Sequence, residues 1–258
     1  MITSRQTSFP TSFRSSASLS CALTLACSQA EPTTGVDDNR DLCATGHMQS
    51  PIDLPAHALR GSEDVVFAYQ PDDLRIVDNG HTIQINHDQA SELRVDGKLF
   101  VLSQYHFHSP SEHAEVGSRH ALELHLVHTD DSGNFAVVAV FLDPSDAENR
   151  AHDPVWRHLP VDVDGIERVY DDERVNPAAF LPSELTHYRY SGSLTTPPCT
   201  ETVTWLVMRQ PVFVTAEHID AFRDHYRANA RPLQPRPDWC LDQTSHAAHS
   251  FSGTDHKP

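Results

Sequence analysis

The chain has 258 residues and a formal net charge of −17, because 36 acidic side chains outnumber 19 lysines and arginines. This length suits one large β-rich domain. So acidic a chain lacks the basic surface that nucleic-acid binding requires. No apolar run approaches the ~18 residues of a transmembrane span. We therefore expect neither nucleic acid as a partner nor a membrane-spanning segment.

The first 30 residues have the character of a leader. They contain Arg5 and Arg14, no acidic residue, and a short apolar run over residues 22–27. A basic start, an apolar middle and small residues before a cleavage point are typical of an export signal. We therefore expect an exported protein, periplasmic or extracellular. Two alternatives stay open: a lipoprotein signal that places a lipid anchor on Cys27, and an organellar transit peptide, which is also serine-rich and acid-poor.

The rest of the chain divides into three parts. We interpret residues 31–42 as a linker, residues 43–235 as the folded domain, and residues 236–258, rich in Pro, Asp, Ser and His, as a flexible tail. Alternating and continuous apolar runs predict strands in the domain. In chain order they are Val65–Tyr69, Leu74–Val77, His81–Asn86, Glu92–Val95, Leu99–His108, Ala121–Thr129, Asn134–Leu142 and Thr202–Met208.

Few helices are predicted. One covers residues 146–158 and a second covers residues 216–230, where Ile219, Phe222 and Tyr226 have core spacing behind a capping Thr215. Residues 176–180 predict a single helical turn with proline at its first position. The sequence therefore indicates a mainly β (α+β) domain.

Two of the predicted strands carry histidines in a metal-binding pattern. Side chains of a strand alternate between its faces, so His106 and His108 share a face with Gln104, and His125 shares one with Glu123. If the two strands are neighbours, the three imidazoles converge. Three neutral nitrogens and one open position form the ligand set of a catalytic zinc. Gln104 and Glu123 are then placed to accept the other ring N–H and fix the tautomers.

Chance and core packing offer a simpler interpretation of these histidines. The chain has 18 histidines, so one His-x-His pair can arise by accident, and a single strand histidine is commonly a core residue with satisfied hydrogen bonds. The Glu-x-His pair on a second apolar strand favours the metal site.

Four further motifs carry a family resemblance. They are Gln49-Ser50-Pro51, Asp78-Asn79-Gly80-His81, Ser109-Pro110-Ser111-Glu112-His113, and the run from Tyr190 through Thr195-Thr196-Pro197-Pro198-Cys199 to Glu201. With the histidine strands, and in this order, they closely resemble the α-class carbonic anhydrases in their bacterial form, from about Cys43 to Pro235. The resemblance implies a single domain around a large, twisted, mixed and mostly antiparallel sheet with a few short peripheral helices.

The resemblance also implies an activity and its residues. We expect zinc-dependent, reversible hydration of carbon dioxide to bicarbonate and a proton, with Zn²⁺ held by His106, His108 and His125 and its water acting as hydroxide. Glu112 and Thr195 match the pair that orients this hydroxide, and His81 matches the proton shuttle. Positions matching those that line the substrate pocket or the water path are Gln84, Val127, Val137, Leu194, Thr195, Thr196, Val203 and Trp205.

A disulfide between Cys43 and Cys199 is implied in the same way. Such a bridge persists only in an oxidising compartment, which agrees with export. The alternative is two buried free thiols. Cys240 has no evident partner.

The chain departs from the family at its start. Members usually begin the domain with a tryptophan- and tyrosine-rich arm, whereas this sequence has no Trp before Trp156 and no Tyr before Tyr69. Either the arm is lost or the chain start is not the native one. Two other functions stay open: a non-catalytic carbonic-anhydrase-like binding protein, and an exported protein that sequesters metal. A monomer and a homodimer are equally compatible with the sequence.

Overall fold

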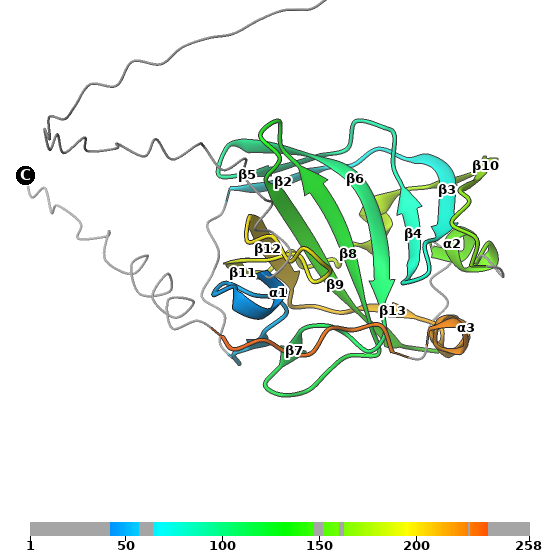
Figure 1. Ribbon diagram of the computed structural model, residues 1–258. Coiled ribbons are helices and arrows are strands. Elements are labelled where there is room, and N and C mark those ends of the chain that lie inside the picture. Colours follow the sequence, from blue (N-terminus) through cyan, green and yellow to red (C-terminus); the bar gives the residue numbers. More distant parts are fainter. Residues whose placement is uncertain (1–41, 57–63, 147–151, 160–162, 227, 237–258) are drawn as a thin grey trace, which may run out of the picture. The chain divides into compact units, whose positions relative to one another are not determined.

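One large sheet organises the part of the chain that the computed structural model describes, which is residues 42–56, 64–146, 152–159, 163–226 and 228–236. Its strands are β2 (Val65–Ala68), β3 (Asp72–Asp78), β4 (Ile83–Asn86), β5 (Glu92–Val95), β6 (Lys98–His108), β8 (Leu122–Thr129), β9 (Phe135–Pro144), β10 (Arg168–Val175), β11 (His187–Gly192), β12 (Val203–Met208) and β13 (Val212–Val214). The main path runs β10-β3-β4-β6-β8-β9-β12-β11 (Figure 1). In addition, β5 joins β2 to β6, and β13 pairs with β9.

The sheet is mixed but mostly antiparallel. Within it, β9 runs parallel to β12 and β13, and the other pairs are antiparallel. A separate two-stranded parallel pair joins β1 (Asp53–Leu54) to β7 (Ala114–Glu115). The predicted fold class is therefore confirmed.

The central strands are buried on both faces. In β8 the first seven of eight residues are buried. Leu122, Leu124 and Leu126 face a core cluster that includes Phe107. Burial of each such side chain contributes about 1.5–3 kcal/mol, so the middle of the sheet is its most stable part. On the opposite face of β8, His125 lies within a second buried layer. The packed core beneath the strand therefore gives His125 a rigid support.

All eight predicted strands are present, one of them (Glu92–Val95) with its predicted bounds and the others with shifted ends, and three strands of the main sheet were not predicted. The strand predicted from His81 begins only at Ile83, so His81 lies in the turn before β4, which corrects that boundary. The missed strands are β10, β11 and β13. The strands β10 and β11 lie at the two ends of the sheet path. Edge strands carry many charged and polar side chains, so the apolar periodicity by which a strand is predicted is weak there.

The helices are shorter than predicted. Within residues 146–158 the described helix is α2 (Asp153–Arg157); residues 147–151 lie outside the description. The helix predicted to reach residue 230 is α3 (Ala216–His225), so the longer extent is wrong. It ends because Tyr226 adopts extended backbone angles, and the segment beyond it makes long-range hydrogen bonds instead. The Thr215 cap and a 3₁₀ turn at Pro177–Phe180 are confirmed.

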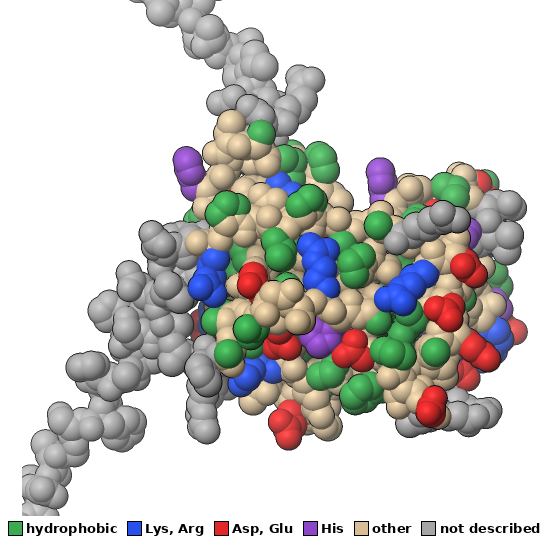
Figure 2. All heavy atoms as spheres, turned by 90° about the horizontal axis from the view of Figure 1, so that it is seen from below, with side chains coloured by type: hydrophobic (Ala, Val, Ile, Leu, Met, Phe, Trp, Pro, Cys, Tyr) green, Lys and Arg blue, Asp and Glu red, His purple; other side chains and the backbone are tan. Residues whose placement is uncertain are grey.

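Surface charge is dispersed on the face that Figure 2 presents. Basic, acidic and apolar side chains alternate there, without a continuous basic patch. Of the helices in the described residues, none has the length and apolar character to cross a membrane. The predicted leader, the linker up to residue 41, the tail from residue 237, and with them Cys27 and Cys240, lie outside the described residues.

Candidate metal centre

Three histidines meet where β6 lies beside β8. The antiparallel register pairs His106 with His125, and the next residue pair on the same face is His108 with Glu123. The imidazole centroids of His108 and His125 are 4.6 Å apart, and that of His106 lies 5.0 and 5.3 Å from them. Alternation along the two strands predicted that these residues would cluster. The pairing of β6 with β8 brings them together.

Two polar neighbours fix the orientation of two of the rings. His106 Nδ1 lies 2.9 Å from Gln104 Oε1, and His125 Nε2 lies 2.8 Å from Glu123 Oε1. Amide and carboxylate oxygens accept, so these ring nitrogens carry the hydrogens. Nε2 of His106 and Nδ1 of His125 are therefore left as bare lone pairs.

His108 has a comparable neighbour that the sequence did not reveal. Its Nδ1 lies 3.4 Å from the backbone carbonyl oxygen of Asn229, and its Nε2 is buried without a hydrogen-bond partner. One ring nitrogen from each of the three histidines lies within 4.8 Å of the others. A buried nitrogen rarely stays unpaired. Three converging lone pairs with one position open fit a tetrahedral metal such as zinc.

The charges around the cluster keep it in the metal-binding form. Burial lowers the pKa of His106 well below its ordinary value, and the neighbouring imidazoles reinforce that shift. Burial also lowers the pKa of His108, although Glu112 opposes it. Burial alone would raise the pKa of Glu123, but His113 and His125 hold it well below its usual range. Burial thus favours the neutral rings of His106 and His108, and these rings lie beside an ionised Glu123 carboxylate, a combination suited to binding a cation.

Glu123 is itself held by a buried network. His113 donates its backbone N–H at 2.8 Å and its ring Nδ1–H at 2.7 Å to the carboxylate. The Nε2 atom of His113 lies 2.6 Å from Tyr190 Oη, and this hydroxyl donates to Ser50 Oγ at 2.9 Å. No role was predicted for His113 or Tyr190 from the sequence. One signal could have pointed to them: a buried carboxylate such as Glu123 needs more hydrogen-bond donors than the single histidine His125 provides.

An apolar wall adjoins the cluster. Val127, Val137 and Trp205 are paired across neighbouring strands and buried on the histidine face. The indole of Trp205 lies 4.9 Å from the imidazole of His125 and donates Nε1–H to the Ser193 carbonyl. Val203 belongs to the same buried cluster, and the partly buried Leu194 packs against it. One cluster beside His125 thus contains or contacts five of the residues that the sequence predicted to line a substrate pocket: Val127, Val137, Leu194, Val203 and Trp205.

Glu112 is buried near the cluster, but the structure does not join it to Thr195. Glu112 Oε1 accepts the backbone N–H of Arg231 at 2.7 Å and lies 3.6 Å from His108 Nδ1. Glu112 Oε2 is buried without a hydrogen-bond partner. Thr195 is half-buried and Thr196 is exposed on the loop before Pro197.

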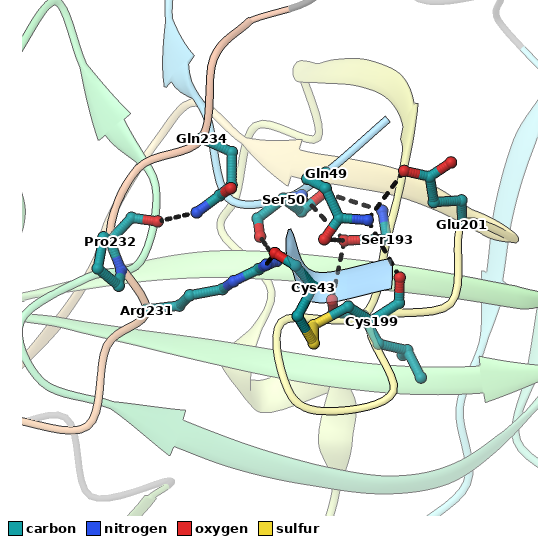
Figure 3. Close-up of a disulfide and its surroundings, with 10 residues drawn as sticks. Cys43, Gln49, Ser50, Ser193, Cys199, Glu201, Arg231, Pro232 and Gln234 are labelled. Atoms are coloured by element: carbon teal, nitrogen blue, oxygen red, sulfur yellow. Dashed lines mark hydrogen bonds between the residues drawn. A yellow bond between two sulfur atoms is a disulfide. The ribbon is translucent and has the colours of Figure 1, made fainter. Parts of the chain in front are cut away.

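A disulfide anchors that loop. The Cys43–Cys199 bridge joins α1 (Leu42–Thr45) to the loop across 156 positions of sequence, as predicted (Figure 3). Arg231 donates to the carbonyl oxygens of Cys43 and Ser50 at 2.9 and 2.6 Å. Because Arg231 also donates its backbone N–H to Glu112, the same residue connects the disulfide region to the rim of the histidine site.

His81 is exposed in the turn between β3 and β4. Gln84 follows on β4 and pairs directly with His106 of β6, so it faces the histidine cluster. Gln84 Oε1 accepts a hydrogen bond from Asn79 of the same turn at 3.2 Å. A polar residue therefore lies between the His81 turn and the cluster, where the sequence predicted a water path.

The chain is similar to known proteins of a single family. Residues 37–237 match the family described as eukaryotic-type carbonic anhydrase. A protein named carbonic anhydrase from Pectobacterium carotovorum is 40% identical over 196 residues, which cover 75% of this chain and 79% of that protein. One from a Nostoc species is 38% identical over 202 residues, 76% of each chain. The solved α-carbonic anhydrase of Thermovibrio ammonificans, in complex with the inhibitor sulfanilamide, has 40% identity and a TM-score of 0.72, covering 76% of this chain and 87% of that one.

Proposed function

The chain belongs to the eukaryotic-type, or α-class, carbonic anhydrase family and is an enzyme of that family, and on this premise we propose that it uses zinc to hydrate carbon dioxide reversibly to bicarbonate and a proton. The observation that carries the zinc assignment is the buried, unpartnered Nε2 of His108 within reach of His106 and His125. Family membership supports the reaction.

His106, His108 and His125 would hold the metal. Gln104, Glu123 and the Asn229 carbonyl keep the three rings in the tautomers that present lone pairs. Bound zinc would supply a Lewis acid that brings the pKa of its water near neutrality, as is general for carbonic anhydrases. The charge of Glu123, which accepts a hydrogen bond from His125, would offset part of the positive charge at the site.

The apolar wall suits an uncharged, apolar substrate. Carbon dioxide makes no strong hydrogen bonds, so Val127, Val137 and Trp205 can hold it by contact and by excluding water. Val203 and Leu194 extend the wall, while Thr196 at its exposed end offers a hydroxyl to bicarbonate as it leaves.

Glu112 and Thr195 are proposed to set the direction of attack. A threonine hydroxyl that donates its proton to an ionised carboxylate can only accept a further hydrogen bond, so it fixes where a neighbouring O–H points. The unpartnered, buried Oε2 of Glu112 supports this assignment, because a buried carboxylate oxygen requires a donor.

His81 is proposed to accept at its imidazole the proton released by hydration and to pass it to solvent. Its exposure supports this role, and Gln84 provides a polar surface between it and the histidine cluster. We also propose export of the protein, because the Cys43–Cys199 bridge is compatible with an oxidising compartment.

Stopped-flow carbon dioxide hydration by the zinc-loaded protein tests the proposal. The parent protein should be active with one zinc per chain, and His125→Ala should lose both stoichiometric zinc and activity. His187→Ala, which removes a half-buried histidine outside the cluster, is the matched control and should retain both. Several weakly bound zinc ions without turnover would support metal sequestration. One tight zinc without turnover would support a binding protein.

A further inference from the structure

The turn that carries His81 is organised by its own side chains. Asn79 Oδ1 accepts the backbone N–H groups of His81 and Thr82, each at 3.0 Å. The Gly80 N–H donates to Asp78 Oδ1 at 2.9 Å, and Gly80 has a φ of +85°, which favours glycine. These local bonds give the turn its shape but do not hold it in place against the rest of the fold.

Asp78 holds the turn against the end of α3. Its side chain is fully buried, and Oδ2 accepts the Nε2–H of His225 at 2.7 Å. Oδ1 also accepts the hydroxyl hydrogen of Tyr226. Both carboxylate oxygens are therefore used, and the two donors come from a helix end almost 150 positions later in the chain. Charge-assisted bonds of this kind are stronger than neutral ones and are specific in geometry.

The segment after α3 makes a second connection. Asn229 Nδ2 donates to the carbonyl oxygens of His81 at 2.9 Å and Phe107 at 3.1 Å. The backbone carbonyl of the same residue lies 3.4 Å from His108 Nδ1. One stretch of chain thus touches both the His81 turn and the strand that supplies two of the clustered histidines.

We propose that Asp78, together with His225 and Tyr226, is a positioning group for the proton-transfer step. It fixes the His81 turn relative to the histidine cluster, so that the imidazole stands at a constant separation from the reacting site. This inference rests on the proposed function. Proton transfer through intervening water requires a maintained geometry, so a turn released from α3 slows that step. Attack on carbon dioxide does not involve the turn and is unaffected.

Three variants test the inference: Tyr226→Phe, His225→Gln and Asp78→Asn. Tyr69→Phe is the matched control, because it removes a buried tyrosine hydroxyl that bonds to His128, remote from the turn. Each protein is assayed for carbon dioxide hydration in dilute and in concentrated imidazole buffer. Amide hydrogen exchange at Gly80 and His81 is measured with and without zinc, which gives a readout independent of turnover.

We expect the three variants to lose roughly threefold to tenfold in kcat in dilute buffer, less than the 10²–10⁴ that side-chain proton transfer contributes. Their kcat/KM should stay within about twofold, and imidazole buffer should restore kcat, because it carries the same proton. Exchange at Gly80 and His81 should accelerate. Tyr69→Phe should change none of these.

Two results would overturn this inference and leave the proposed function standing. In the first, the parent protein is active and the variants keep both kcat and amide protection. In the second, the variants lose kcat and kcat/KM together and imidazole buffer does not restore kcat. The second result would indicate a purely structural role. An inactive zinc-loaded parent protein would instead refute the proposed function, and the inference with it.

Discussion

Protonation of His128 should destabilise the fold at mildly acidic pH. His128 lies on β8, three positions after His125 and therefore on the opposite face, and it is fully buried. Its Nδ1 donates to the Ala136 carbonyl at 3.1 Å, which leaves Nε2 to accept the Tyr69 hydroxyl at 2.9 Å. Both bonds use the neutral ring. Burial lowers the pKa of His128 from 6.5 to about 4.

The sign and size follow from proton linkage. Above pH 6.5 neither the folded nor the unfolded state binds this proton, so the free energy of unfolding is unaffected. Between pH 6.5 and about 4 the unfolded state binds it and the folded state does not, so stability falls as pH falls. The two pKa values imply a loss of about 2 kcal/mol between pH 7 and pH 5 from this residue.

His128→Gln tests this account, because glutamine can donate to the Ala136 carbonyl and accept from Tyr69 without titrating. Urea unfolding at pH 7 and pH 5 gives the free energy of unfolding of each protein. The advantage of the parent protein over the variant should shrink by about 2 kcal/mol between the two pH values. His47→Gln controls for the loss of an exposed histidine. A difference that changes by less than ~0.5 kcal/mol would refute the reasoning.

Three further predictions follow from the site and the disulfide. His81→Ala should lower kcat in dilute buffer and leave kcat/KM nearly unchanged, with rescue by imidazole; unchanged turnover would exclude His81 as the shuttle. Glu123→Gln should weaken zinc affinity by about 10- to 100-fold in equilibrium dialysis, since it removes the charge behind His125; parental affinity would contradict that role. Reducing Cys43–Cys199, which spans 156 positions, should lower the free energy of unfolding by up to about 5 kcal/mol, and a loss near zero would show that the bridge constrains the unfolded chain little.

The centre of the histidine site was predictable from the amino-acid sequence alone. Alternation along a strand has a period of two, so His106, His108 and Gln104 had to share a face wherever that strand lay. The alternating and apolar runs at residues 121–129 and 134–142 likewise predicted the strands that became β8 and β9. These features are local, and local backbone geometry is enough to interpret them.

The distant groups that complete the site, in contrast, become evident only from the folded chain. The Asn229 carbonyl oxygen lies beside His108 Nδ1 across 121 positions, and Tyr190 contacts His113 across 77. The motifs that contain His113 and Tyr190 did not indicate that these two side chains meet. Directly after α3, Tyr226 donates a hydrogen bond to Asp78, which lies 148 positions earlier, and the edge strand β10 is defined by its pairing with β3. These features depend on contacts between segments that are remote in the sequence. Such contacts are determined by how the chain packs, and a local sequence pattern does not encode that packing.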